Sequence, residues 1–204
     1  MKEIAFTSSK AELRRTLRPS RGFSARQTSL RNASTILWER ALGLRQLRGA
    51  SQVGLYVPLP GEPQPLRALE WAFSEKRQPF LPKVLNETLL YLALDPLSKL
   101  IIGRYGLPEP IGGKPWHPRH GDVLFIPGLA FDTRGFRLGR GKGCFDRFLA
   151  TLPACVIKVG ICFESNLFLS LPADAWDQRV DIVVTEEQAL FCTACCHKLQ
   201  PEGV

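Results

Sequence analysis

Apolar residues in the first quarter of the chain recur at helical spacing. Leu13 and Leu17 lie one turn apart behind the S-x-x-E pattern of a capping box, which predicts a short helix over residues 10–19. A second capping box, S-A-R-Q at residues 24–27, precedes a longer set of apolar residues with the same spacing. We expect this longer helix to serve as scaffolding and to end near Gly49, because glycine commonly follows the last turn of a helix.

Short apolar runs then alternate with further helical segments. Residues 53–57, ahead of Pro58, form the compact apolar run of a buried strand. Similar patterns predict strands over residues 80–84, 88–94, 122–127, 155–163 and 182–185, helices over 65–77 and 145–152, and a long loop over 95–121. This alternation indicates an α/β fold, which we expect to be a single-domain three-layer αβα structure with a largely parallel sheet and helices on both faces.

The composition is that of an ordinary globular protein. The 204 residues are 45% apolar and 23% charged, and we expect one α/β domain over residues 1–190 and a cysteine-rich tail over 191–204. No apolar run approaches the ~18 residues of a membrane span, and the N-terminal residues do not follow the pattern of a signal sequence. We therefore expect a cytoplasmic protein whose six cysteines stay reduced.

The tail contains residue types that bind zinc, namely Cys192, Cys195, Cys196 and His197. A structural zinc site needs four ligands in suitable geometry, and no second Cys/His cluster is present to complete one. The order also differs from the C-x-x-C-H pattern of haem attachment, because Cys196 occupies the histidine position. The cluster is therefore interpreted as a thiol-rich tail.

The net charge of +8 is concentrated near the N-terminus. Residues 1–50 contain 11 Lys and Arg against 3 Asp and Glu, whereas residues 51–204 contain 16 of each. One hypothesis is that this basic segment binds nucleic acid. Its cations recur among apolar residues at helical spacing without an aromatic-interleaved nucleic-acid motif, which favours a helical face that attracts a small polyanion or is simply solvated.

The strongest chemical signal is the sequence R-L-G-R-G-K-G-C-F-D at residues 137–146. Three glycines that alternate with two cations permit positive-φ backbone and expose N–H groups as an anion nest, next to the N-terminus of the following helix. The loop is not a Walker A motif, because Phe136 and Gly143 stand where that motif has a glycine and a hydroxyl residue. Its G-x-G-x-G spacing also differs from the dinucleotide fingerprint. We expect the loop to bind phosphate.

Together with P-G-L-A-F-D at residues 127–132 and with Gly135, this loop resembles the signature of the 5-formyltetrahydrofolate cyclo-ligase family, P-G-x-A-F-D-x-x-G-x-R-L-G-x-G-x-G-Y-Y-D. Residues 105–110, Y-G-L-P-E-P, resemble the family's F-G-I-x-E-P, and we assign them to pocket shaping. The resemblance implies a ligase that uses ATP and Mg²⁺ to convert 5-formyltetrahydrofolate to 5,10-methenyltetrahydrofolate with release of ADP and phosphate.

The resemblance also implies roles for individual residues. The catalytic residues would be Arg140 and Lys142. ATP would contact Lys10, Arg14, Arg137, Leu138, Gly139, Arg140, Gly141, Lys142, Gly143, Cys144 and Phe145. The folate would contact Glu62, Arg140, Gly141, Lys142, Gly143 and Cys144. The Mg²⁺ ligands would be Asp146 and Asp177, because Mg²⁺ binds through one or two carboxylates plus substrate phosphates.

Several residues depart from the usual family pattern. Cys144 and Phe145 replace two tyrosines, Asn166 stands near the place of a glutamine, and Trp176 replaces a smaller polar residue or histidine. The alternatives are therefore a divergent α/β phosphoryl-transfer or sugar-phosphate enzyme with the same loop, and the nucleic-acid-binding protein considered above. The favoured partners are ATP and a reduced folate, with or without a polyglutamate tail. We expect a monomer that binds neither nucleic acid nor membrane.

Overall fold

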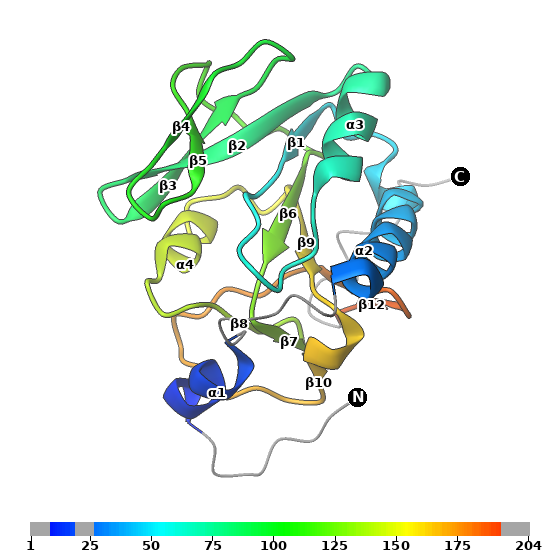
Figure 1. The fold of residues 1–204 in the computed structure, drawn as a ribbon, viewed down its shortest axis with the longest axis vertical. Coiled ribbons are helices and arrows are strands. Elements are labelled where there is room, and N and C mark those ends of the chain that lie inside the picture. Colours follow the sequence, from blue (N-terminus) through cyan, green and yellow to red (C-terminus); the bar gives the residue numbers. More distant parts are fainter. Residues whose placement is uncertain (1–8, 19–26, 193–204) are drawn as a thin grey trace.

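The computed structural model describes residues 9–18 and 27–192 (Figure 1). Its helices are α1 (Lys10–Leu17), α2 (Gln27–Leu42), α3 (Leu66–Ser74) and α4 (Cys144–Leu149), with 3-10 turns at Arg45–Leu47 and Glu164–Asn166. The strands are β1 (Gln52–Gly54), β2 (Gln78–Leu85), β3 (Thr88–Ala93), β4 (Leu100–Ile102), β5 (Pro108–Pro110), β6 (Val123–Pro127), β7 (Ala130–Asp132), β8 (Arg137–Leu138), β9 (Ile157–Ile161), β10 (Leu167–Phe168), β11 (Ile182–Val184) and β12 (Ala189–Phe191).

A seven-stranded sheet forms the centre of the molecule, in the order β12-β11-β9-β6-β1-β2-β3. The five inner strands pair in parallel, and β12 and β3 are antiparallel edges. Every residue of β6 is buried, as expected for a parallel strand covered on both faces. The expected α/β class with a largely parallel sheet is confirmed.

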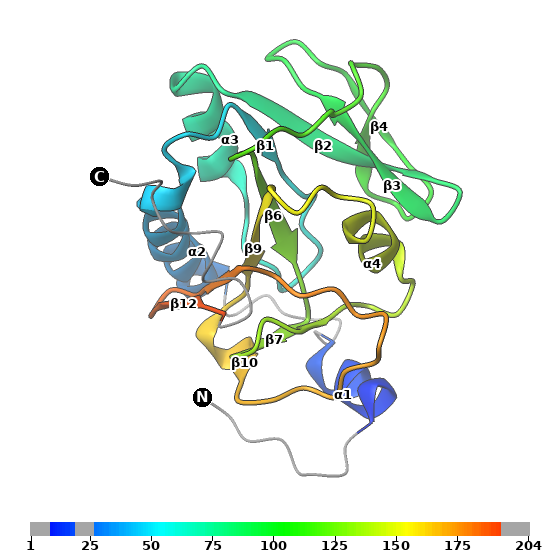
Figure 2. The same ribbon diagram turned by 180° about the vertical axis from the view of Figure 1, so that it is seen from behind.

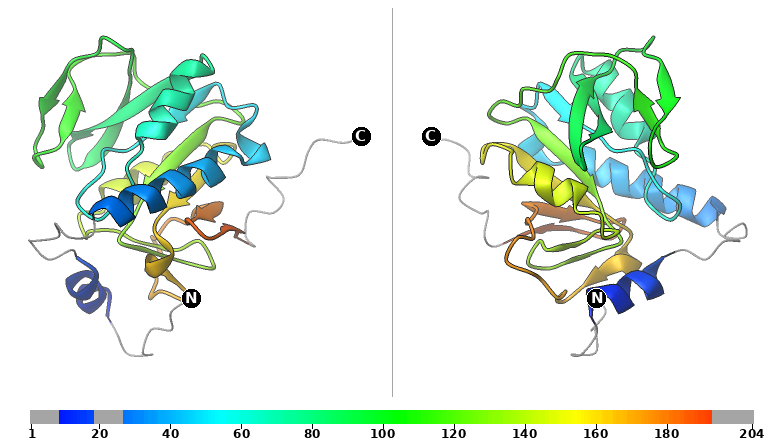
Figure 3. Two further views of the ribbon diagram at one scale, coloured as in Figure 1. Left: turned by 45° about the vertical axis from the view of Figure 1, so that its right-hand side comes forward. Right: turned by 90° about the vertical axis from the view of Figure 1, so that its left-hand side faces the viewer.

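Helices cover both faces of this sheet. One apolar cluster joins α2 and α3 to the sheet through Trp38, Ala41, Ala68 and Ala72, and a second cluster on the other face includes Leu149 of α4. Figure 3 shows α4 on one side of the strands and α2 with α3 on the other. The layers therefore follow the αβα order expected from the alternation of strands and helices.

A small sheet of order β10-β7-β8 lies next to the large one and supports α1. Leu13 of α1 is buried against Leu138 of β8 and Phe168 of β10. Figures 1 and 2 both show α1 beside these three strands. The capping box of α1 forms as predicted, since the Ser9 hydroxyl accepts from the Glu12 N–H and the Glu12 carboxylate accepts from the Ser9 N–H.

Several predicted boundaries were wrong. The long helix ends at Leu42 rather than near Gly49, and a 3-10 turn follows. The predicted loop over 95–121 contains the β4–β5 hairpin. The small sheet was missed because its strands are only two or three residues long. In the part of the chain that the structure describes, no helix is long and apolar enough to cross a bilayer.

The C-terminal boundary also differs from the expected one. The predicted division between residues 190 and 191 falls within β12, and Cys192 is buried in the second core cluster. The backbone N–H of Cys192 donates to the Asp181 carbonyl at 3.0 Å. The expected single domain stays a prediction. Residues 193–204, and with them the rest of the Cys/His cluster, lie outside the described residues, as do residues 24–26 of the second capping box.

Gly160 of β9 provides a test of how the two sheets pack. A Cβ atom at this position would lie 2.4 Å from Cε1 of Phe131, a fully buried ring on β7. Gly160→Ala should therefore lower the free energy of unfolding by roughly 1–3 kcal/mol in urea denaturation, because the ring has no free space to move into. Gly49→Ala is the control, since its Cβ would meet no atom within 4 Å. Equal stability of the two variants would contradict this account of the packing.

Candidate functional site

The candidate site lies where the order of the parallel strands reverses. The chain runs from β1 to β2 on one side of the sheet and later returns to β6 on the other side of β1. Ligands in open α/β sheets bind outside the carboxyl ends of the strands at such a switch point. A cavity of about 780 Å³ is present here, lined by Tyr56 and Glu62 after β1 and by Pro127 and Gly128 at the end of β6. Its volume is within the range of small-molecule sites.

The predicted phosphate loop forms one wall of this cavity, between β8 and α4. Gly141 and Gly143 have φ angles of 97° and 68°, a region that L-residues with side chains rarely adopt. Gly139 has a different role, because a Cβ atom there would lie 2.6 Å from Nη1 of Arg137. Gly141 and Gly143 therefore allow the loop to turn, and Gly139 allows the buried Arg137 guanidinium to pack close to the backbone.

Three arginines bind carbonyl oxygens of the loop. Arg14 Nε donates to Gly139 O at 2.9 Å and Arg18 Nη2 donates to Arg140 O at 3.2 Å, both from the N-terminal segment. Arg147 of α4 donates to the Lys142 carbonyl at 2.8 Å. The three guanidinium groups offset the negative partial charge of these carbonyl oxygens, so the loop is more favourable for binding an anion. We refer to this set of contacts as the arginine clamp.

Glu62 lies in a turn that its own side chain stabilises, and it contacts the side chain of Arg140 from the loop. Its Oε2 accepts from the Leu59 N–H at 2.9 Å, and its Oε1 accepts from Nε and Nη2 of Arg140, both at 3.3 Å. The residue is only 8% exposed. Burial raises the pKa of the Glu62 carboxyl, and its bonds to Leu59 and Arg140 offset only part of this shift.

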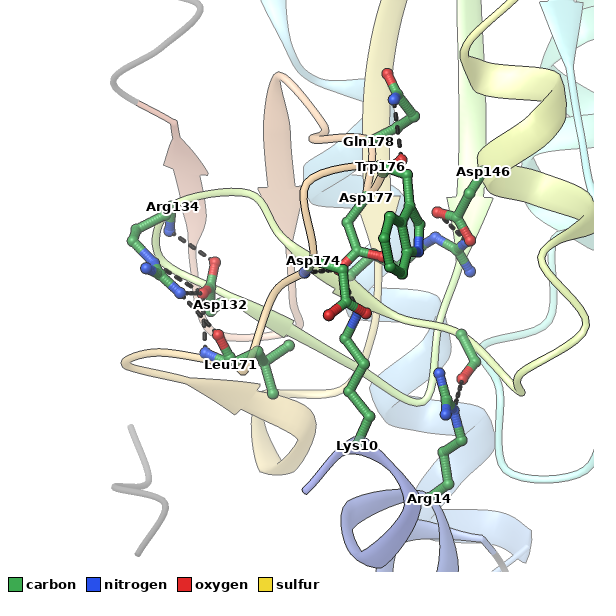
Figure 4. Close-up of polar contacts among 12 residues, drawn as sticks. Lys10, Arg14, Asp132, Arg134, Asp146, Leu171, Asp174, Trp176, Asp177 and Gln178 are labelled. Carbon is green, nitrogen blue, oxygen red and sulfur yellow. Dashed lines mark hydrogen bonds and ion pairs between the residues drawn. The ribbon is translucent and has the colours of Figure 1, made fainter. Parts of the chain in front are cut away.

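Two further sets of opposite charges line the cavity. Arg137 Nη2 donates to Asp146 Oδ1 at 2.9 Å. The Lys10 ammonium bridges Asp177 and Asp174, with 2.6 Å to Asp174 (Figure 4). Burial lowers the pKa of Lys10, but its bonds to the two aspartates outweigh this effect and raise the pKa above its ordinary value. Lys10 therefore stays charged, and the first helix is tied to the segment around residue 175.

Lys142 differs from these cations. Its side chain is exposed and lines the cavity, and it makes no hydrogen bond or ion pair with any residue that the structure describes. Arg140, by contrast, is bound to Glu62 and to the Pro60 carbonyl. The ammonium of Lys142 is therefore available to an anionic ligand without the loss of an internal ion pair.

The structure brings most of the predicted site residues to one cavity. The cavity is lined by Lys10, Arg14, Glu62, Arg137, Gly139, Arg140, Gly141, Lys142, Gly143, Cys144, Phe145, Asp146 and Asp177. Leu138 is the exception, because its side chain is buried in the cluster that holds α1. Pocket shaping by the Y-G-L-P-E-P segment is confirmed, since Tyr105, Leu107, Pro108 and Glu109 line the cavity.

Some lining residues were not found from the sequence. Arg18, Arg147 and Asp174 contact residues far away in the chain, and Gln178 contacts only the nearby Trp176 carbonyl among the hydrogen bonds of the described residues. No local motif marks these four lining residues. Asn166, noted as a departure from the family pattern, is not among the lining residues. Its side-chain amide donates to the Leu129 carbonyl at 2.7 Å, which indicates a structural role.

Comparison with known proteins identifies relatives over nearly the whole chain. The sequence model of the 5-formyltetrahydrofolate cyclo-ligase family matches residues 6–186. A probable 5-formyltetrahydrofolate cyclo-ligase of Schizosaccharomyces pombe is 27% identical over 77% of this chain and 85% of its own length. The 5-formyltetrahydrofolate cyclo-ligase of Haemophilus influenzae is 30% identical over 72% of this chain and 82% of its own length.

Solved structures agree with these sequence matches. A 5,10-methenyltetrahydrofolate synthetase of Aquifex aeolicus has a TM-score of 0.76 and 28% identity, and the match covers 96% of this chain and 95% of that one. A second synthetase, from Mycoplasma pneumoniae, has a TM-score of 0.67 over 88% of this chain and 99% of that one. At 20% identity, the second match shows the likeness of the fold.

The raised pKa of Glu62 predicts how its replacement changes stability with pH. Between the ordinary pKa of 4.5 and the raised value, the folded protein binds more protons than the unfolded chain, so stability falls as the pH rises. Glu62→Gln removes this ionisation and keeps an acceptor for the Leu59 N–H. The melting temperature of the variant relative to the unaltered protein should therefore be higher at about pH 7 than at about pH 4. A difference that is constant, or that falls with pH, would show that burial does not control this carboxyl.

Proposed function

Because this chain belongs to the 5-formyltetrahydrofolate cyclo-ligase family, we propose that it catalyses the ATP-dependent cyclisation of 5-formyltetrahydrofolate to 5,10-methenyltetrahydrofolate. The observation that supports this most directly is that one cavity is lined both by the loop, with its available Lys142, and by the buried carboxyl group of Glu62. An assay that follows the methenyl product by its near-ultraviolet absorbance, with ATP omitted in a parallel reaction, tests the proposal.

The reaction requires that the formyl oxygen become a leaving group. Transfer of the γ-phosphoryl group of ATP to this oxygen releases ADP, after which N10 of the folate attacks the activated carbon. The C–O bond then breaks, the oxygen leaves within inorganic phosphate, and N10 loses its proton. Positioning and charge stabilisation carry most of the catalysis in phosphoryl transfer, and the arginine clamp and the exposed ammonium of Lys142 supply both.

Arg140 and Glu62 have linked roles in this proposal. Arg140 contributes its backbone to the phosphate loop and its guanidinium to the Glu62 carboxylate. Glu62 is a buried hydrogen-bond acceptor in the lining of the cavity, where hydrogen-bond donors of the folate would bind. Loss of the Arg140 side chain would leave the Glu62 charge buried without its partner, so Lys142 is the cleaner position for a test of catalysis.

Asp146 and Asp177 fit the requirements of a magnesium ion. One oxygen of each carboxylate is bound by a cation, and the second oxygen accepts no hydrogen bond from the described residues. Among those residues, no group of three or more His, Cys, Asp or Glu side chains could hold a metal. Mg²⁺ does not need one, because it commonly binds through one or two carboxylates together with phosphate oxygens and water. The ion would neutralise charge on the phosphates.

The binding partners follow from the same proposal. They are ATP and a reduced folate. Lys10, Arg14 and Arg18 support this, because their side chains bind residues that line the cavity instead of forming an exposed basic surface for nucleic acid. That the enzyme acts as a cytoplasmic monomer remains a prediction from the sequence.

Lys142→Met tests the catalytic role of the loop. The variant should fold normally because the side chain is exposed and has no partner among the described residues. Loss of one group that stabilises transition-state charge typically costs ~3 kcal/mol, so kcat should fall roughly 100-fold while the KM for the folate changes little. Lys99→Met, at an exposed position outside the cavity, is the matched control. Turnover near that of the unaltered protein would show that the loop does not handle the transferred phosphoryl group.

Glu62→Gln tests the folate side of the cavity. The substitution removes the Glu62 carboxylate from the lining of the cavity and leaves the arginine clamp in place. We expect the KM for 5-formyltetrahydrofolate to rise at least tenfold, since a bond to a charged group is typically worth ~1.5–3 kcal/mol, and the KM for ATP to stay within about twofold. Equal changes in both constants would place Glu62 in a structural role rather than in folate binding.

A further inference from the structure

Trp176 has an unusual environment for a tryptophan. It is 71% exposed, whereas Trp38 and Trp116 are buried and Trp71 is half-buried. The indole makes no ring, cation or hydrogen-bond contact with the described residues, and it nevertheless lines the cavity. Tryptophan combines a large apolar surface with a flat ring that can stack on other rings, so an exposed indole on a cavity wall is suited to contact a ligand.

The backbone on both sides of this ring is held in place. Asp174 and Asp177 are joined by the Lys10 ammonium, and the Asp174 N–H donates to the Asp177 carboxylate at 2.7 Å. The Gln178 side-chain amide donates to the Trp176 carbonyl at 3.1 Å. Figure 4 draws no hydrogen bond to the indole itself, whereas Asp174, Asp177 and Gln178 on either side of Trp176 each take part in one. The backbone that carries the ring is therefore held in place, so that binding of a ligand would mainly restrict the side-chain torsions of Trp176.

The position of the ring favours the nucleotide over the folate. Trp176 lies one residue from Asp177 and belongs to the segment that Lys10 ties to α1, and α1 in turn contacts the phosphate loop through Arg14. The opposite part of the cavity has an apolar wall of its own from β2, β3 and the β4–β5 hairpin, namely Pro82, Val84, Leu89, Tyr105 and Leu107. A folate ring can be accommodated there, and Trp176 then joins Phe145 as an aromatic side chain that lines the cavity outside this apolar wall.

We propose that Trp176 is a nucleotide-binding residue that stacks on the base of the bound nucleoside triphosphate. This inference rests on the proposed function, because it requires that the loop bind the phosphates of a nucleotide. Every base has an aromatic face, and stacking of a base on an aromatic side chain contributes appreciably to affinity.

The test compares a nucleotide with a ligand that has no base. Calorimetry would measure binding of a non-hydrolysable ATP analogue and of inorganic tripolyphosphate to the full chain and to Trp176→Ala. The variant should bind the ATP analogue roughly tenfold more weakly and tripolyphosphate within about twofold of the unaltered protein. Trp176→Phe should retain most of the affinity because a phenyl ring can still stack. The melting temperature should change little, since the indole is exposed.

Fluorescence supplies an independent readout. The ATP analogue should quench the emission of the exposed indole, and Trp176→Phe should remove this signal, whereas the control Trp71→Phe, at a position outside the cavity, should keep it. The inference would be overturned if Trp176→Ala lost equal affinity for the ATP analogue and for tripolyphosphate. It would also be overturned if the variant raised only the KM for the folate. Binding of the ATP analogue that is insensitive to both Trp176 variants would overturn it while leaving the proposed function intact. Failure of the unaltered protein to bind either ligand would refute both.

Discussion

The arginine clamp on the phosphate loop is the contact on which the rest of the site depends. A loop with alternating glycines has high conformational entropy when free, and its own carbonyl oxygens would repel a phosphate. Arg14 and Arg18 bring the N-terminal segment to these carbonyls, and Arg147 brings α4. Arg147 also donates to the Glu87 carbonyl in the β2–β3 turn, so the clamp connects three separate parts of the chain. The order of the loop is therefore a tertiary property, although its flexibility is encoded locally.

The charged side chains of the cavity differ in whether they have a partner of opposite charge. The buried Glu62 pairs with the partly exposed Arg140, and burial raises the pKa of the Glu62 carboxyl despite this partner. Lys142 lacks such a partner among the described residues. Because Arg140 belongs to the loop and also binds Glu62, one residue joins the loop to the turn after β1.

The departures from the family pattern change the character of the cavity without removing its main features. Phe145 keeps an aromatic ring, 5.2 Å from the Arg137 guanidinium, but lacks the phenolic hydroxyl of a tyrosine. Cys144 is largely buried and provides a small thiol in place of a second phenol. Trp176 adds an exposed aromatic side chain to the lining of the cavity. The balance between hydrogen bonding and stacking thus differs from the family pattern, while the loop and its cations are retained.

Local physical rules were enough to predict much of this protein from its sequence. The capping box at Ser9 and the positive φ of Gly141 depend on residues only a few positions apart, and the alternation of strands and helices indicates the parallel sheet. The family pattern also located most of the cavity residues. Only the tertiary structure decided which side chains are paired and which are available. Lys10 contacts Asp174, 164 positions away, and β10 of the small sheet pairs with β7, from which it is separated by α4 and β9 in the chain. Such contacts have no sequence period, because they depend on how the layers pack.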